Sequence, residues 1–223
     1  MRKHDRGEVL LEGPRVVRQA VEYGVELELL AVREGIEFDL PAKRKVVLDA
    51  RAFNAAAATE TPQGVLATAG WSRDVRLSDG LRQARSAGWP LVVLDGIQDP
   101  ANVGTIARSA VGFGAPVLVA LAGTVVPWHP KVVRASAGHV FGALWALEND
   151  LGDLNAVGAD AGGTPLDRSD LEDVDAIVFG SEAHGLSRQM PTVSVPTRPG
   201  FESLNVAAAA AVILHEVSRR IAA

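Results

Sequence analysis

The sequence predicts an α/β protein with a Rossmann-like parallel sheet in its C-terminal part and a small α/β domain before it. Between residues 91 and 121, two short apolar runs flank a helical segment, and parallel strands need such a crossover connection. A third apolar run, at 176–179, is typical of a strand buried on both faces. Helical and extended patterns also alternate over residues 1–70. We therefore expect domains at 1–70 and 88–223, with a linker and one short helix at 71–87.

The first 70 residues contain one helix with a clear start. Pro14 suits the first turn of a helix, and apolar residues follow it at helical spacing. Strands are expected at 27–32, 46–48 and 64–69, with a short helix at 52–58. This order predicts a small α/β domain.

The stretch 91–121 gives the clearest strand–helix–strand pattern. A strand at 91–94 ends where glycine and proline break the apolar run. Asn102 can cap the following helix, because its side-chain oxygen can accept a hydrogen bond from a free backbone N–H group. Gly114 suits the left-handed position after that helix, and a second strand follows at 117–121.

Arg108 lies in this helix among small, apolar residues. Helical side chains lean toward the N-terminus, and Gly104, four residues earlier, has no side chain to block the way. We therefore expect the guanidinium to reach the start of the helix, where free N–H groups and the helix dipole favour an anion. The alternative is a surface arginine near a carboxylate such as Asp99.

The C-terminal part shows two more strands and a long helix. Strands are expected at 176–179 and 193–195, and Gly180 after the first would let a ligand approach the backbone closely. The last helix begins at Ser203 or Asn205 and runs to residue 220. Because it looks apolar on all sides, we expect it in the core.

Composition narrows the classes of function. The net charge of −5 argues against a nucleic-acid binder, but nine of the fourteen acidic residues after position 80 lie between 148 and 175, so a basic face elsewhere is compatible with it. The absence of cysteine excludes disulfides and thiolate chemistry and fits a reducing cytoplasm. No run of 18 apolar residues predicts a membrane span. His129, His139 and His184 lack zinc-binding spacing, so we assign no metal.

Three stretches, taken in chain order, form a recognisable set of motifs. They are Asp95-Gly96-x-x-Asp99-Pro100-x-Asn102-x-Gly104-x-Ile106-x-Arg108-Ser109-Ala110, then Ile177-Val178-Phe179-Gly180-Ser181-Glu182-x-x-Gly185-Leu186-Ser187, then Val195-Pro196 with Ser203-Leu204-Asn205-Val206-Ala207 and Glu216. This set resembles the three motifs of the SpoU (TrmH-like) family of RNA ribose methyltransferases, which belongs to the SPOUT class. The resemblance covers nearly the whole chain, and Ser181 departs from the asparagine found in many relatives.

The resemblance implies a fold and a cofactor that the pattern alone does not predict. In this family the C-terminal segment is threaded into a deep trefoil knot, a topology that is otherwise very rare. S-adenosylmethionine sits against the knotted loops and is held largely by main-chain groups. Those contacts would fall here on Gly180, Val195 and Leu204, with Phe179 and Pro196 as neighbours.

The resemblance also implies catalytic roles. Arg108 matches the family's catalytic arginine, and since arginine stays protonated, we expect it to clamp an RNA phosphate and orient the ribose hydroxyl. Asn102, Glu182, Ser203 and Asn205 match the other polar positions of the motifs. The alternatives are a helix cap for Asn102 or Ser203 and a structural loop anchor for Glu182.

The N-terminal part resembles the substrate-binding domain of the same family, so its basic residues are candidates for RNA contact. A single surface cation is more often an ordinary solvated charge, whereas clusters are better suited to phosphates. The candidates are Arg2, Lys3, Arg6, Arg15, Lys43, Arg44 and Lys45, together with Lys131 and Arg134 one helical turn apart in the second domain.

The implied function is 2′-O-ribose methylation of RNA by a cytoplasmic enzyme that depends on S-adenosylmethionine. The extra N-terminal domain favours ribosomal RNA, and family members pair as homodimers through the knotted domain. Two alternatives stay open at this point. One is a transfer RNA ribose methyltransferase, and the other is a catalytically silent RNA-binding or ribosome-assembly factor with the same fold.

Overall fold

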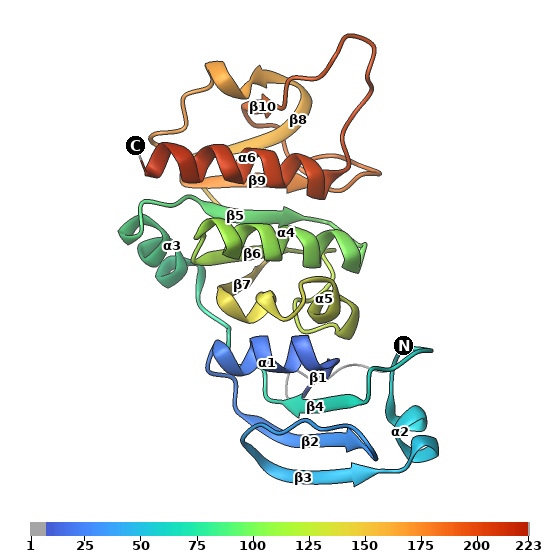
Figure 1. The fold of residues 1–223 in the computed structure, drawn as a ribbon. Coiled ribbons are helices and arrows are strands. Elements are labelled where there is room, and N and C mark those ends of the chain that lie inside the picture. Colours follow the sequence, from blue (N-terminus) through green and yellow to red (C-terminus); the bar gives the residue numbers. More distant parts are fainter. Residues whose placement is uncertain (1–7, 223) are drawn as a thin grey trace.

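The computed structural model describes residues 8–222. The chain folds around two β-sheets (Figure 1). The first has the strand order β1-β4-β2-β3, in which β4 pairs antiparallel with both β1 and β2, while β3 pairs parallel with β2 at the edge. Its strands are β1 Val9–Glu12, β2 Leu27–Arg33, β3 Ala42–Leu48 and β4 Val65–Ala69.

Two helices accompany the first sheet. Helix α1, Pro14–Glu22, starts with its proline in the first turn, as predicted. Helix α2, Ala50–Ala56, is capped by the Asp49 carboxylate, which accepts a hydrogen bond from the backbone N–H of Ala52. The predicted strands and helices of this part are confirmed, although β1 was not predicted and β3 begins four residues earlier than expected.

The second sheet is the predicted parallel one. Its strand order is β10-β8-β9-β5-β6-β7, and every neighbouring pair is parallel. The central strands β5 and β6 are buried along their whole length, as is typical of sheets covered on both faces. The strands are β5 Leu91–Asp95, β6 Val117–Leu121, β7 Leu144–Glu148, β8 Ala156–Pro165, β9 Ala176–Gly180 and β10 Thr192–Ser194.

Helices cover both faces of this sheet. Helix α3, Leu77–Ser86, packs on one face with Leu91 and Val93 of β5. Helices α4, Pro100–Phe113, and α6, Val206–Ile221, cover the other face with Val92 and Leu94 (Figure 1). Successive side chains of β5 point to opposite faces of the sheet and therefore pack in two different apolar layers.

Helices α4 and α6 correct two predictions. Helix α4 begins at Pro100 and is capped by Asp99, so Asn102 lies inside its first turn instead of capping it. Helix α6 is capped by Asn205 and ends at residue 221, and Gly114 ends α4 in the left-handed conformation, as predicted. The expectation that α6 is buried on all sides was wrong, because Val212 is 45% exposed.

The two sheets share one hydrophobic core. Helix α5, Pro130–Ala135, packs against β1, and the short 3-10 helix η1, His139–Gly142, packs against α1 and α4. A Cβ on Gly142 would lie 2.6 Å from Cγ1 of Val111 and 2.7 Å from the ring of Tyr23, so only glycine allows this close approach. The N-terminal sheet and α1 are therefore packed tightly against the helices α5 and η1 that lie beside the second sheet.

The segment 71–87 belongs to the second sheet in its packing. The backbone N–H of Val75 donates to the carbonyl oxygen of Trp145, and the N–H of Trp145 donates to the carbonyl oxygen of Arg73. The Arg73 guanidinium also donates to the carbonyl oxygen of Tyr23, at the end of α1. This segment thus connects the two parts through fixed contacts.

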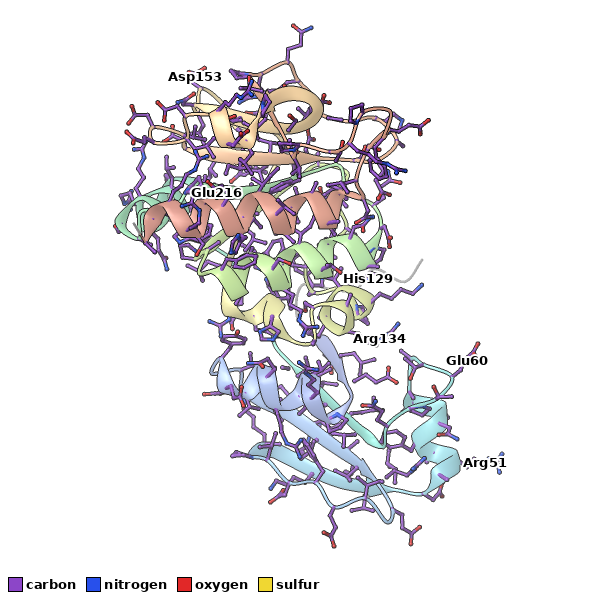
Figure 2. The ribbon with its side chains drawn as sticks, turned by 45° about the horizontal axis from the view of Figure 1, so that its top comes forward. Arg51, Glu60, His129, Arg134, Asp153 and Glu216 are labelled. Carbon is purple, nitrogen blue, oxygen red and sulfur yellow. The ribbon has the colours of Figure 1, made fainter. Side chains whose placement is uncertain are left out.

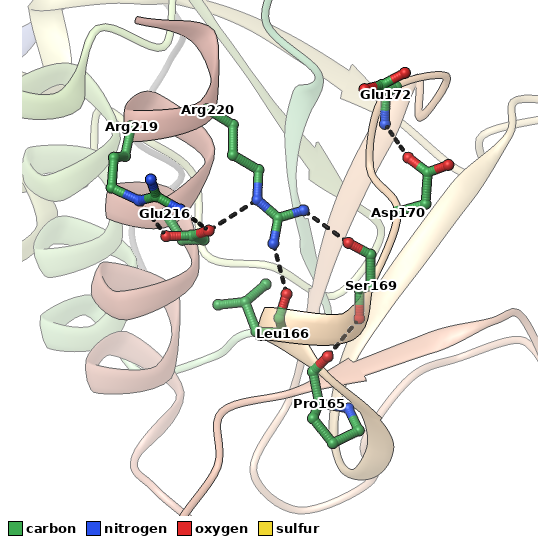
Figure 3. A network of polar contacts seen from close by, with 8 residues as sticks. All are labelled: Pro165, Leu166, Ser169, Asp170, Glu172, Glu216, Arg219 and Arg220. Atoms are coloured by element: carbon green, nitrogen blue, oxygen red, sulfur yellow. Dashed lines mark hydrogen bonds and ion pairs between the residues drawn. The ribbon is translucent and has the colours of Figure 1, made fainter. Parts of the chain in front are cut away.

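The end of α6 is anchored by Arg220 (Figure 3). Its guanidinium donates to the carbonyl oxygens of Leu166 at 2.6 Å and Ser169 at 2.7 Å, in and after the short 3-10 helix η2, Leu166–Arg168, that follows β8. Its Nε donates to Glu216 at 2.8 Å, and Arg219 binds the same carboxylate. These contacts join the last helix to the connection between β8 and β9.

Within residues 8–222, no helix combines the length and the apolar character that a membrane crossing would require.

Candidate functional site

A cavity of 290 Å³ lies among the predicted site residues, at the carboxyl end of β9 and beside β8 and β10. Its walls come from residues 159–161 in the middle of β8, from the loop after β9, and from the chain between β10 and the first turns of α6. Ligands of open parallel α/β sheets bind at this edge of the sheet. The cavity is therefore our candidate cofactor site.

Beside the cavity, three polar side chains from three distant stretches meet. Asn205 donates from Nδ2 to Oε1 of Glu182 at 2.7 Å, and Asn102 donates to the same oxygen at 3.2 Å. Asn205 also donates to Oδ1 of Asn102 at 3.1 Å, while its own Oδ1 accepts from the N–H groups of Ala207 and Ala208. We call Asn102, Glu182 and Asn205 the polar triad.

The polar triad fixes one oxygen of Glu182 and leaves the other available. Both amide donors bind Oε1, and Oε2 has no hydrogen-bond partner among the described residues. Glu182 also lines the cavity. These contacts agree with the loop-anchor interpretation of Glu182, and its catalytic role stays a prediction.

The predicted cofactor contacts divide into two groups. Gly180, Val195 and Leu204 line the cavity, and the predicted catalytic residue Ser203 lines it as well without capping α6. Phe179, on strand β9, is fully buried in the hydrophobic core and does not line the cavity. Pro196 does not line it either and borders a separate hollow beside α6.

Gly180 has a structural role in addition to lining the cavity. A Cβ at this position would lie 2.4 Å from the carbonyl carbon and oxygen of Gly185 and 2.8 Å from the backbone nitrogen of Leu186. The missing side chain makes room for the turn that brings Ser181 and Gly185 together in a β-bridge. The close approach is therefore to the protein's own backbone.

The cavity also contains acidic residues that the sequence patterns did not reveal. Asp160 and Glu202 line it together with Glu182, and no lysine, arginine or histidine is among its lining residues in the described part of the chain. Asp160 was missed because β8 was not predicted as a strand. The cavity is consequently suited to a positively charged ligand.

Arg108 does not take the position predicted for it. A Cβ on Gly104 would lie 2.6 Å from Cβ of Ala135 and 2.7 Å from the carbonyl oxygen of Val132, so α5 occupies the space that was expected to be open. Arg108 is exposed, does not line the cavity, and makes no hydrogen bond or ion pair with residues 8–222. The predicted pairing with Asp99 is also absent within these residues.

Two arginines converge on one histidine where the two sheets meet. Burial lowers the pKa of His139, and the positive charges of Arg108 on α4 and Arg15 on α1 lower it further. The ring of His139 is hydrogen-bonded through Nδ1 to the hydroxyl of Tyr23 at 2.9 Å. Arg134 is exposed at the same boundary (Figure 2). Arg15 and Arg108, from the two parts of the chain, thus both lie near His139, with Glu22 as an opposing charge.

The other side chains predicted to contact RNA differ in exposure and in ion pairing. Lys131 is exposed on α5, and Arg44 is exposed on the edge strand β3. Its neighbours Lys43 and Lys45 form ion pairs with Glu28 at 2.7 Å and Asp39 at 2.5 Å. Arg2, Lys3 and Arg6 lie outside the described residues.

Known proteins match both the second sheet and the whole fold. Residues 90–215, more than half of the chain, match the model of the SpoU rRNA Methylase family. An "uncharacterized tRNA/rRNA methyltransferase" of Mycolicibacterium paratuberculosis is 38% identical over 159 residues, which cover 64% of this chain and 52% of that protein. The chain spans about half the length of the curated relatives it matches.

Solved structures resemble the chain over nearly its full length. The SpoU methyltransferase AviRb from Streptomyces viridochromogenes, in complex with the cofactor AdoMet, is 26% identical with a TM-score of 0.79, covering 97% of this chain and 92% of that one. An RNA 2′-O ribose methyltransferase is 25% identical with a TM-score of 0.76, covering 100% and 93%. With the family model, the three motifs and the polar triad in agreement, the chain belongs to the SpoU rRNA methylase family.

Proposed function

We propose that the protein transfers a methyl group from S-adenosylmethionine to a ribose 2′-hydroxyl of RNA, with ribosomal RNA as the substrate. The observation that carries this proposal is the polar triad at the rim of the cavity, because each of its members comes from a different family motif. A structural neighbour that acts on the ribose 2′-oxygen of RNA supports the site of methylation.

The cavity fits S-adenosylmethionine in charge and in position. The cofactor carries a sulfonium and an ammonium group, and Asp160, Glu182 and Glu202 line the cavity. Its volume of 290 Å³ lies near the lower end of ligand pockets, roughly 300 Å³. The main chain at Gly180, Val195 and Leu204 would hold the cofactor, which when bound supplies an electrophilic methyl group.

The chain's own groups would position the acceptor hydroxyl for the transfer. Glu182 lines the cavity with Oε2 free of partners among the described residues, and the two amides hold the carboxylate in place. During transfer the methyl–sulfur bond breaks, the carbon–oxygen bond forms, and the hydroxyl proton goes to a phosphate oxygen or a water molecule. Positioning of this kind can supply roughly 7–11 kcal/mol of rate enhancement in ideal geometry.

Arg108 would act in this reaction from a second copy of the chain. Among the described residues the cavity wall contains no cation that could hold the substrate phosphate, while Arg108 is exposed elsewhere without a partner acid. We therefore propose a homodimer in which Arg108 of the partner subunit clamps the phosphate beside the polar triad. The exposed apolar residue Val212 on α6 supplies a surface for pairing. Sedimentation at micromolar concentration should give twice the chain mass of 23.4 kDa, and a monomer would contradict the dimer.

The remaining parts of the chain have proposed roles as well. Residues 1–70 would form the RNA-binding domain, 71–87 the connection, and 88–223 the methyltransferase domain with a deep trefoil knot. The route of the chain supports the knot: it leaves β9 in the middle of the sheet, forms the edge strand β10, and returns so that Asn205 reaches Asn102. The arginines near His139, Arg15 and Arg108, support the RNA-binding role.

Methyl transfer from labelled S-adenosylmethionine to purified ribosomal RNA and transfer RNA tests the proposal directly. We expect label in ribosomal RNA, in dinucleotides that survive alkaline hydrolysis, since the 2′-O-methyl group blocks strand cleavage. Label confined to transfer RNA would assign the other substrate. Cofactor binding without transfer to any RNA would favour the catalytically silent RNA-binding factor.

A further inference from the structure

A second, smaller hollow of 140 Å³ lies next to the cofactor cavity. It forms between the loop after β5, residues 96–99, and the loop after β9, residues 181–184. The two strands are neighbours in the sheet, with Asp95 paired to Gly180, so both loops leave the same edge side by side. We call this hollow the side pocket.

The side pocket and the cofactor cavity have part of their walls in common. Ser181 and Glu182 line both of them, and Asn102 of the polar triad lines the side pocket. A group bound in the side pocket would therefore lie next to the cofactor and next to the free oxygen of Glu182. The acceptor of a methyl group has to occupy such a position.

Two polar side chains of the side pocket have no partner within the described part of the chain. The side chains of Gln98 and His184 are exposed and make no hydrogen bond with the described residues, residues 8–222. The Asp99 carboxylate accepts from the N–H of Ala101 at 2.9 Å, and Asn102 binds Oε1 of Glu182, whose Oε2 stays free among these residues. The side pocket thus offers one free carboxamide and one free imidazole ring.

These two groups match the chemistry of a nucleobase. A carboxamide can both donate and accept hydrogen bonds at a base edge, and aromatic rings, histidine included, stack on unpaired RNA bases. The carboxylates of Asp99 and Glu182 in the wall repel a phosphate. The volume is also well below the roughly 300 Å³ from which ligand pockets usually start, so a single ring fits better than a second cofactor.

We propose that the side pocket holds the base of the nucleotide to be methylated, with Gln98 reading the base edge and His184 stacking on its face. This inference rests on the proposed function and adds a determinant of base specificity to it. It requires the target nucleotide to be unpaired or extruded from its helix, so that its base enters the side pocket while its ribose faces the cofactor.

The test compares full-length variants in the methyl-transfer assay with ribosomal RNA. His184→Ala should lower kcat/KM for RNA by about 5- to 150-fold, the loss expected from removing one stacking side chain. His184→Phe should restore most of it, because phenylalanine still stacks. Gln98→Ala should alter the proportions of the four 2′-O-methyl nucleosides released by nuclease digestion. Gln83→Ala, at an exposed glutamine on α3 that lines neither pocket, serves as the matched control and should behave as wild type.

Calorimetry with S-adenosylmethionine distinguishes a role in base binding from a role in the cofactor site. Affinity for the cofactor should stay within about twofold in all these variants, and an equal loss of cofactor affinity would overturn the inference. An active wild type whose His184→Ala and Gln98→Ala variants match it in rate and in nucleoside proportions would also overturn it, leaving the proposed function intact. A wild type that methylates no RNA would overturn both.

Discussion

Asn205 holds the Glu182 carboxylate at 2.7 Å with its amide nitrogen while its amide oxygen caps helix α6. One side chain therefore starts the last helix and fixes the loop after β9. The two tasks use different atoms of the amide, so substitutions can separate them.

Asn205→Ser should keep the helix cap and lose the bond to Glu182. Serine is as good a cap as asparagine, whereas alanine at a cap position costs about 0.5–2 kcal/mol. We expect Asn205→Ser to unfold near the wild-type temperature. Its rate of methyl transfer should fall at least tenfold, which corresponds to an activation free energy raised by about 1.4 kcal/mol. Asn205→Ala should lose both stability and activity. Thermal unfolding and initial rates measure the two effects, and a fully active Asn205→Ser variant would show that the bond to Glu182 is dispensable.

Arg108→Ala should abolish methylation while leaving cofactor affinity within a few-fold, because Arg108 lies outside the cofactor cavity. Arg108→Lys should fail as well, since a point charge cannot replace the planar guanidinium fork. Comparable turnover in either variant would remove Arg108 from the mechanism.

A mixing experiment tests whether Arg108 acts across a dimer. Arg108→Ala and Glu182→Ala should each be inactive alone. After subunit exchange, half of the dimers combine one subunit of each kind and contain one intact composite site, so about one quarter of wild-type activity should return. If the mixture stays inactive although exchange is demonstrated with tagged chains, the site is complete within one chain.

Gly104→Ala should destabilise the protein although alanine favours helices. Its Cβ would meet Cβ of Ala135 at 2.6 Å and backbone atoms of α5 below 3 Å, and overpacking of this kind costs about 1–3 kcal/mol. Gly112 in the same helix is the matched control, because a Cβ there meets nothing within 4 Å. Gly112→Ala should leave stability unchanged or raise it by up to about 1 kcal/mol. Urea unfolding measures both, and equal effects of the two substitutions would contradict this packing argument.

The Glu216 contacts predict a defined dependence of stability on pH. Hydrogen bonds from Arg219 and Arg220 lower the pKa of Glu216 from 4.5 to about 2. Because the folded-state pKa is depressed, the stabilisation is fully present above about pH 4.5 and is lost as the pH falls toward 2. Glu216→Gln should therefore unfold at a lower temperature than wild type at pH 7, with the difference shrinking between pH 4.5 and 2. Glu34→Gln, an exposed carboxylate without an ion-pair partner in the described chain, should show no such trend.

The sequence predicts the parts of the fold whose causes are local. Pro14 and Gly114 marked helix ends because their backbone preferences suit those positions in any protein. Strand β8 was not predicted because three glycines interrupt its apolar pattern. Two of these glycines are explained by contacts with residues far away in the sequence. A Cβ on Gly158 would meet Leu186 at 2.3 Å, and one on Gly163 would meet the backbone of Thr192 at 2.6 Å. Glycine here permits close approach of another segment, which a single stretch of sequence does not show.

The candidate site was predictable in its membership more than in its geometry. The motif resemblance identified all three members of the polar triad, but Asn102 was expected as a cap, and only the packed structure places it against Glu182. The error at Arg108 has a similar origin. Gly104 was interpreted as free space along its own helix, whereas α5 fills that space from elsewhere in the chain.

The strand order has a consequence for the synthesis of this chain. Strand β5 pairs with β6, which follows soon after it, but its other neighbour β9 begins only at Ala176. At a translation rate of roughly 5–20 residues per second, one edge of β5 and the apolar side of α4 stay uncovered for several seconds before β9 and α6 have been made. Non-local parallel pairing is also slow in itself. The nascent chain is therefore most prone to aggregate during this interval. A chain released before α6 has been made would expose this apolar surface and be prone to aggregation.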